Sequence, residues 1–115
     1  MNILDKIASV LAPQSVEKGY MADMPDVMIG LFEYSGTPPE QSFSGTDIIY
    51  NIQARVRNPK ASPAYVAATN IVAKLNRYQD AEISVLQSTP ILDIGKDAHN
   101  PPRHEYTVNF TIRRL

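Results

Sequence analysis

The sequence contains no cysteine and no tryptophan, and its 11 basic residues nearly balance its 12 acidic ones. Without cysteine, the chain can form neither a disulfide framework nor a thiolate metal site. The net charge of -1 predicts no bulk attraction to nucleic acid or to an acidic membrane. Apolar runs are too short to span a membrane, and Asp5 and Lys6 interrupt the N-terminal one, which is not typical of a signal peptide.

The remaining composition is that of an ordinary globular domain. The chain has 115 residues, 43% of them hydrophobic and 20% charged, which predicts one domain over residues 1–115 with a core of its own. Nine prolines predict many interrupted connections around that core.

Residues 46–78 are the most strongly patterned stretch, and they predict a long strand followed by a helix. Even positions of the strand are apolar and odd positions are polar, with only Ile49 out of step, which predicts one buried and one open face. The even residues are Ile48, Tyr50, Ile52, Ala54 and Val56, and the odd ones are Asn51, Gln53, Arg55 and Arg57. Pro59 ends the strand, and Ser62-Pro63 predicts a capped helix start. The helix stripe comprises Tyr65, Ala68, Ile71, Val72, Leu75 and Tyr78.

The other segments complete an αββαββ order. An amphipathic helix is expected over 2–11, and strands over 27–34, 82–95 (an edge strand interrupted at Pro90) and 104–114. The last strand alternates as cleanly as the 46–57 strand, so these two are expected to be central antiparallel neighbours. The predicted fold is α+β: a four-stranded, mostly antiparallel sheet of order 1-2-4-3 with two helices on one face.

No motif in the sequence indicates catalysis or a bound metal. His99 and His104 lie near a polar loop over 96–103, without the spacing of metal ligands, and are interpreted as loop histidines. No nucleophile elbow and no phosphate-binding glycine loop occurs. We therefore expect a protein that is not an enzyme and needs no cofactor or metal.

Five arginines gather at the ends of the two alternating strands: Arg55, Arg57, Arg103, Arg113 and Arg114. They can be a solvated sheet face, or a contact surface for carboxylates of a neighbouring subunit, which suit arginine forks. A nucleic-acid platform is a third interpretation, but it would need stacking aromatics on the same face. Possible carboxylate partners are Asp47, Glu33 and Glu105.

Several motifs together resemble a known family. They are Met24-Pro25-Asp26-Val27 leading into Phe32-Glu33-Tyr34-Ser35-Gly36-Thr37-Pro38-Pro39, then Tyr50-Asn51-Ile52-Gln53-Ala54-Arg55-Val56-Arg57, then a Tyr65-Val66-Ala67-Ala68 helix ending in Lys74-Leu75. In these features the chain resembles, over roughly its whole length, the small minor capsid and tail terminator (tail completion) proteins of long-tailed bacteriophages. None of the motifs is a catalytic signature.

The resemblance implies a structural virion protein. Such a protein closes the end of the tail tube as an oligomeric ring, usually a hexamer, and provides the surface for head-tail joining. Implied partners are further copies of the chain, the tail tube protein and the head-tail connector, with genomic DNA passing through the lumen without specific binding and no membrane. The protein would be made in the host cytoplasm and reside in the virion tail.

The subunit interface expected for such a ring is a set of arginines and loop residues. It comprises Arg55, Arg57, Arg113, Phe43, Pro38 and Pro39. An alternative function is a small cytosolic binding module that uses the open sheet face for a peptide or ligand. A measurement of size separates the two, because a chain that stays a monomer or dimer favours the module.

Overall fold

Two long antiparallel strands, β5 (Ile49–Asn58) and β8 (His104–Arg114), form the centre of the sheet. They are seen in a computed structural model that describes residues 2–34, 40–42 and 45–115. The register pairs Ile52 with Phe110 and Ala54 with Val108, so the apolar residues of both strands share one face. The alternation in the sequence therefore predicted these two neighbours and their buried face correctly.

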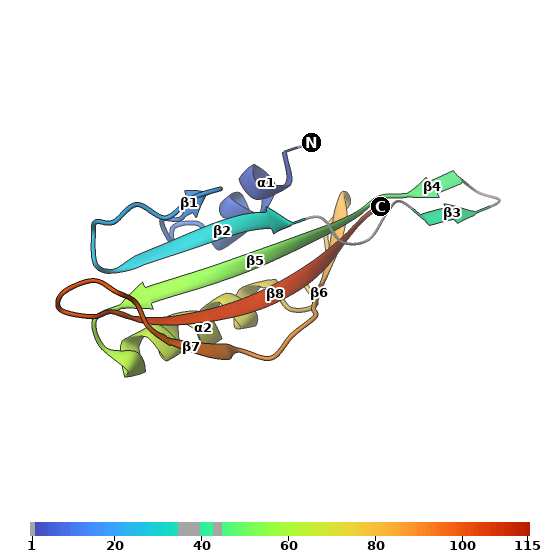
Figure 1. Ribbon diagram of the computed structural model, residues 1–115. Helices are drawn as coiled ribbons and strands as arrows, with labels where there is room; N and C mark the ends of the chain where they lie inside the picture. Colours follow the sequence, from blue (N-terminus) through green and yellow to red (C-terminus); the bar gives the residue numbers. More distant parts are fainter. Residues whose placement is uncertain (1, 35–39, 43–44) are drawn as a thin grey trace.

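The sheet has six strands in the order β1-β2-β5-β8-β6, with β7 also paired to β8 (Figure 1). β2 (Met28–Tyr34) runs antiparallel to β5, and β1 (Glu17–Lys18) runs parallel to β2. β6 (Ile83–Gln87) and β7 (Leu92–Lys96) pair with successive parts of β8. The α+β class is thus present, but the predicted four-stranded, mostly antiparallel sheet of order 1-2-4-3 is wrong.

The extra strand β1 explains part of this difference. It lies between the predicted 2–11 helix and the predicted 27–34 strand, and its two residues are too few to show a periodicity. Gly19 ends the strand with φ +84, a conformation that favours glycine, and its N–H donates to Leu31 O at 2.7 Å. The hydrogen bond to β2, rather than any pattern in the segment, places β1 at the sheet edge.

The break between β6 and β7 explains the rest. The predicted 82–95 strand is divided because Pro90 has no N–H to continue the ladder. At the break the Thr89 hydroxyl accepts the N–H of Asn109 at 2.9 Å, while Ser88 N–H donates to Asn109 O at 2.8 Å. A side chain thus replaces the missing strand partner, and β8 continues past the break.

A separate two-stranded hairpin, β3 (Glu40–Ser42) and β4 (Gly45–Asp47), projects beyond one end of the main sheet (Figure 1). Its strands pair only with each other among the described residues. The molecule is correspondingly elongated, with extents of 54 × 25 × 22 Å. The hairpin lies at the opposite end of β5 from the loop that joins β7 to β8 (Figure 1).

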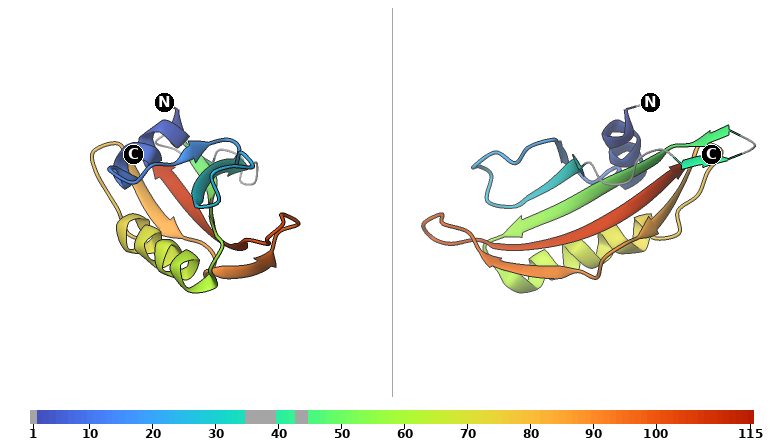
Figure 2. Two further views of the ribbon diagram at one scale, coloured as in Figure 1. Left: turned by 90° about the vertical axis from the view of Figure 1, so that its left-hand side faces the viewer. Right: turned by 45° about the vertical axis from the view of Figure 1, so that its right-hand side comes forward.

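Both helices, α1 (Ile3–Leu11) and α2 (Ala61–Leu75), lie on the same side of the twisted sheet (Figure 2). Asn2 caps α1, since its side chain accepts the Asp5 N–H at 3.2 Å. The predicted Ser62 cap of α2 is wrong, because the helix begins at Ala61 and Lys60 occupies the cap position without a side-chain hydrogen bond. Neither helix of the described residues is long and apolar enough to cross a membrane.

One core fills the space between the helices and the sheet. It contains the predicted even residues of the central strands, the α1 stripe and the inner side of α2, which is lined by alanines where it approaches the sheet. Its fully buried side chains include Ile3, Ile7, Leu11, Leu31, Ile52, Leu75, Ile83, Val85, Val108, Phe110 and Ile112. Tyr65, predicted to belong to the stripe, is about half exposed, and Ala64 is buried instead. The opposite face of the sheet is left uncovered by the helices (Figure 2).

Candidate functional site: the open sheet face

The sheet face away from the helices has a polar centre. Across β5 and β8, Gln53 lies opposite Asn109, and Asn51 lies opposite Thr111. Gln53 Nε2 donates to Asn109 Oδ1 at 3.2 Å, and Thr111 Oγ1 donates to Asn51 Oδ1 at 3.5 Å. These bonds hold the amide groups in fixed orientations across the two central strands.

Arg55 lies beside this polar centre and contacts β2. Its register partner on β2 is Gly30, where an added Cβ would come within 2.5 Å of Met21 Cγ and 3.0 Å of Phe32. Side chains thus approach the backbone closely at Gly30. The Arg55 guanidinium carbon lies 5.9 Å from the centre of the Phe32 ring, a cation–π distance. Arg55 Nε is removed from water and has no hydrogen-bond partner in the described part of the chain, which leaves a donor unsatisfied.

Large apolar side chains border the polar centre. Tyr34 lies opposite Asn51 and is 38% exposed, while Leu86 lies opposite Thr111 and is 58% exposed. Leu92 is 44% exposed and lies opposite Thr107, which in turn lies opposite Arg55 on β5. The three residues come from three different strands, so apolar area flanks the polar centre on both sides. Such a surface offers a partner both hydrogen-bonding groups and apolar area that can be buried from water.

Arg57 lies on the predicted face of β5, opposite Glu105, but it is buried there and so does not belong to the open surface. Its side chain is only 5% exposed, because residues 22–26 pass over it. Nη2 donates to the carbonyl oxygens of Ala22 at 2.8 Å, Asp23 at 3.3 Å and Pro25 at 2.6 Å, and Nε donates to that of Asp26 at 3.3 Å. Arg57 therefore anchors this segment to the sheet.

Arg103 anchors the same segment from the other side and is only 4% exposed. Its guanidinium pairs with Asp97 at 2.8 Å, Asp23 at 3.2 Å and Asp26 at 3.3 Å, and it also donates to Asp23 O. Two buried arginines thus share one loop, and Asp97 links that loop to the β7–β8 connection. Sequence reasoning placed Arg103 among the strand-end arginines without finding this role.

The carboxyl of Asp97 is held ionised by this network. Burial alone would raise its pKa, but hydrogen bonds from the Arg103 N–H and guanidinium and from the His99 N–H outweigh burial and lower it below 3.8. The pKa of Asp93 is also lowered, by the Gly95 N–H and by His104.

Because these pKa values are lowered in the folded state, the stability they give is present above the unfolded pKa and is lost as pH falls through the folded pKa. We expect the free energy of unfolding to decrease between about pH 6 and about pH 3. Asp97→Asn should show a smaller decrease over that range. Urea denaturation at both pH values measures it, and equal pH dependence in native chain and variant would contradict the role of Asp97.

The other predicted interface residues lie in different places. Arg113 is exposed near the end of β8, opposite Ile49. Of its suggested partners, Glu105 is half-buried opposite Arg57, and Glu33 lies opposite Ile52, whose position belongs to the helix-side face. The remaining interface residues, Phe43, Pro38 and Pro39, lie outside the described residues, and of Asp47 only the place in β4 is described.

The histidines are engaged within the β7–β8 region. His104 Nε2 lies 2.7 Å from Asp93 Oδ1 and its ring stacks on Tyr106, with centres 5.0 Å apart. His99 Nδ1 lies 2.9 Å from Pro101 O. Among the described residues, no group of three His, Asp or Glu side chains is placed to hold a metal ion.

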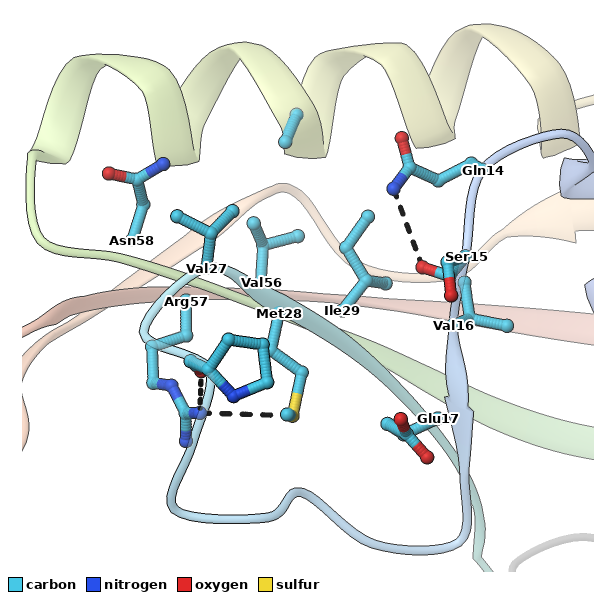
Figure 3. Close-up of a pocket in the computed structure, with 12 residues that line it drawn as sticks. Gln14, Ser15, Val16, Glu17, Val27, Met28, Ile29, Val56, Arg57 and Asn58 are labelled. Carbon is cyan, nitrogen blue, oxygen red and sulfur yellow. Dashed lines mark hydrogen bonds between the residues drawn. The ribbon is translucent and has the colours of Figure 1, made fainter.

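An apolar groove of about 290 Å³ lies on the helix side, between α2 and the start of β2 (Figure 3). Val27, Ile29 and Val56 point toward α2, and Gln14 and Ser15 close one end (Figure 3). A second cavity of about 280 Å³ continues past Gln14. Each volume is near the lower limit for a small-molecule site, and Arg57 turns its guanidinium to the other side of the strands (Figure 3).

The open face can bind a polar or acidic partner surface, because it combines an unsatisfied arginine donor, fixed amides and exposed apolar residues. The groove combines apolar contacts from Val27, Ile29 and Val56 with the polar side chains of Gln14, Ser15 and Asn58. No protein-family model and no curated protein matches the chain.

Proposed function

We propose that this chain is a structural protein of a long-tailed bacteriophage that closes the end of the tail tube as a ring of identical subunits. The observation that carries the proposal is the β3–β4 hairpin, which extends past the end of the sheet. A two-stranded hairpin alone is only marginally stable in water, so a projecting one favours a second chain as its packing partner. The sequence motifs add the resemblance to tail terminators.

Two unlike surfaces at different positions along an elongated subunit support a ring. A ring requires a heterologous contact, in which one surface of each copy meets another surface of the next. The hairpin and the open face meet this requirement, since they are distinct and separated along the 54 Å length. A hexamer is the number that the resemblance suggests.

The proposed partners follow from this position in the particle. One rim of the ring contacts the tail tube protein, and the other provides the surface to which the head connector joins. DNA passes through the lumen without specific binding, which suits a chain with net charge -1. The subunit is made in the host cytoplasm, resides in the virion tail and catalyses no reaction.

A size measurement and a purification test the proposal. Sedimentation velocity of the isolated chain is expected to show a discrete oligomer, and the tagged chain is expected to copurify with phage tails. Tails assembled without the chain should have open ends or irregular lengths in electron micrographs. A chain that remains monomeric or dimeric and never copurifies with particles would instead favour a small binding module, which uses the open face for a peptide.

A further inference from the structure

We infer that the open sheet face of one copy receives Glu33 of a second copy, whose carboxylate meets Arg55. The inference rests on the proposed function, because it names a contact between neighbouring subunits of the ring. It depends on two side chains that the structure describes, one a shielded cation and the other an exposed carboxylate.

Arg55 is a cation with an incomplete set of partners. Its Nε is shielded from water and has no acceptor among the described residues, while its guanidinium lies 5.9 Å from the centre of the Phe32 ring. A shielded donor without an acceptor costs free energy, and a charged acceptor restores more of it than a neutral one. Lys60 and Arg77 are exposed by contrast, so an ion pair formed by either contributes little. A carboxylate from a second chain would therefore contribute more at Arg55.

Most carboxylates that could play this part already have a partner within their own chain. The engaged ones are Asp5, Asp23, Asp26, Asp80, Glu82, Asp93 and Asp97, which pair with Lys18, Arg103, Lys6 or His104. Glu17 is hydrogen-bonded to Tyr20. Among the side chains that the structure describes, Glu33 and Glu105 are the carboxylates left without a partner.

These two carboxylates lie on opposite faces of the sheet. Glu105 is half-buried on the open face, the same face as Arg55. Glu33 lies opposite Ile52, whose position belongs to the helix side, and it is exposed although Leu31, two residues earlier, is fully covered. A carboxylate must project from its own surface to reach a second copy, so Glu33 is the better suited of the two.

The contact must form between copies and not within one chain. Arg55 lies opposite Gly30 on β2, and Glu33 lies three residues further along that strand on the other face, so the sheet separates the two side chains. Because the two surfaces are unlike, the contact is head-to-tail, which is the type that closes into a ring. Glu33 also lies near the end of β2 from which the β3–β4 hairpin projects (Figure 1).

The surroundings of Arg55 suit a protein surface as the occupant. Gln53 and Asn109 present amide groups, and the exposed side chains of Leu86 and Leu92 flank them. A second copy would cover this apolar area and receive hydrogen bonds from the amides. One shielded arginine among uncharged amides favours a single carboxylate over the repeated phosphates of a nucleic acid.

Two variants of equal shape test which carboxylate is used. Glu33→Gln is expected to weaken self-association by about 30-fold or more, because a shielded charge on the next copy loses its partner. Glu105→Gln removes the other carboxylate without a partner and is the matched control, which should assemble like the native chain. Sedimentation velocity over a concentration series measures both, and circular dichroism checks that each variant is folded.

A charge swap tests the pairing itself. Arg55→Glu and Glu33→Arg are each expected to sediment as monomers with a native circular dichroism spectrum, because every contact then joins like charges. Both changes combined in one chain should restore the oligomer, because every contact again joins opposite charges.

Several outcomes would overturn the inference. They are native assembly by Glu33→Gln, a charge-swapped chain that is folded but monomeric, and a native chain that is monomeric at every concentration. Loss of assembly in Glu105→Gln alone would mean that two open faces meet each other, and normal assembly of Arg55→Glu with weakened binding to a DNA duplex would make the face part of the lumen. Copurification with tails is scored separately, so the contact can fail while the tail function stands, and the reverse.

Discussion

Arg57→Ala is expected to lower the free energy of unfolding by about 3 kcal/mol or more, although Arg57 lies on the sheet face away from the helices. Its guanidinium is the hydrogen-bond donor to four carbonyl oxygens of residues 22–26. Hydrogen bonds from charged groups contribute about 1.5–3 kcal/mol each, and shielded acceptors left without a donor cost further free energy. Because three of the four bonds share Nη2, their contributions do not simply add.

Arg55→Ala is the matched control, because it removes the same side chain from the same face of the same strand two residues earlier. It deletes one cation–π contact and an unsatisfied donor, so its effect should be within about 1 kcal/mol. Arg57→Lys should fall between the two, because an ammonium cannot reach acceptors in several directions as a guanidinium does. Urea denaturation gives all three values. Equal destabilisation by Arg55→Ala and Arg57→Ala would contradict the anchoring role of Arg57.

Because Arg57 is buried and Arg55 is not, only Arg55 can be replaced to test assembly without also weakening the fold. Reversing both arginines together would combine a surface change with the loss of a buried anchor, so a missing oligomer could reflect unfolding. Arg55→Glu alone changes the open face and leaves the 22–26 segment in place. The clean assembly variants are therefore those that leave Arg57 unchanged.

The centre of the fold could be predicted from the sequence because its signal is local. In β5 and β8 apolar and polar residues alternate over ten residues or so, and this period defines a strand, its buried face and, with two such strands, a preferred pairing. Ile52, Val108 and Phe110 are accordingly fully buried where the pattern placed them. The α1 stripe and its Asn2 cap are equally local features.

The elements that escaped prediction are set by long-range contacts. β1 has only two residues, and they form a strand because they pair with the neighbouring β2. For β6 and β7 the interruption at Pro90 is predicted, but the sequence does not show that the two halves are separate strands bridged by the hydrogen bond from the Asn109 N–H to Thr89 Oγ1. The hairpin β3–β4 lies in a stretch of glycine, serine and proline that is typical of a loop.

Local sequence patterns also fail to distinguish individual residues of the candidate site. Arg55 and Arg57 have identical places in the strand pattern, and the difference between them comes from residues 22–26, more than 30 positions earlier in the chain. No local signal reveals that contact. Asp23, Asp26 and Asp97 do offer a partial one, because a buried arginine needs carboxylates and these three flank the predicted strand ends.

The C-terminal end of α2 connects the helix to the edge of the sheet. Leu75 is its last residue and is fully buried, and the N–H of Asn76 completes the helix by donating to Val72 O at 2.9 Å. Directly after it, Arg77 N–H donates to Val85 O and Val85 N–H donates to Tyr78 O, at 2.9 and 2.8 Å. The chain following Leu75 thus covers the outer edge of β6.

Leu75→Ala is expected to lower the free energy of unfolding by about 2–5 kcal/mol, because a fully buried large side chain is replaced by a small one and a cavity remains between α2 and the sheet. The midpoint of urea denaturation should fall accordingly. Val66→Ala shortens an exposed side chain on the same helix and should change stability by no more than about 0.5 kcal/mol. If both variants unfold at the native midpoint, α2 does not pack through Leu75. If Val66→Ala is the more damaging change, the buried side of the helix is assigned wrongly.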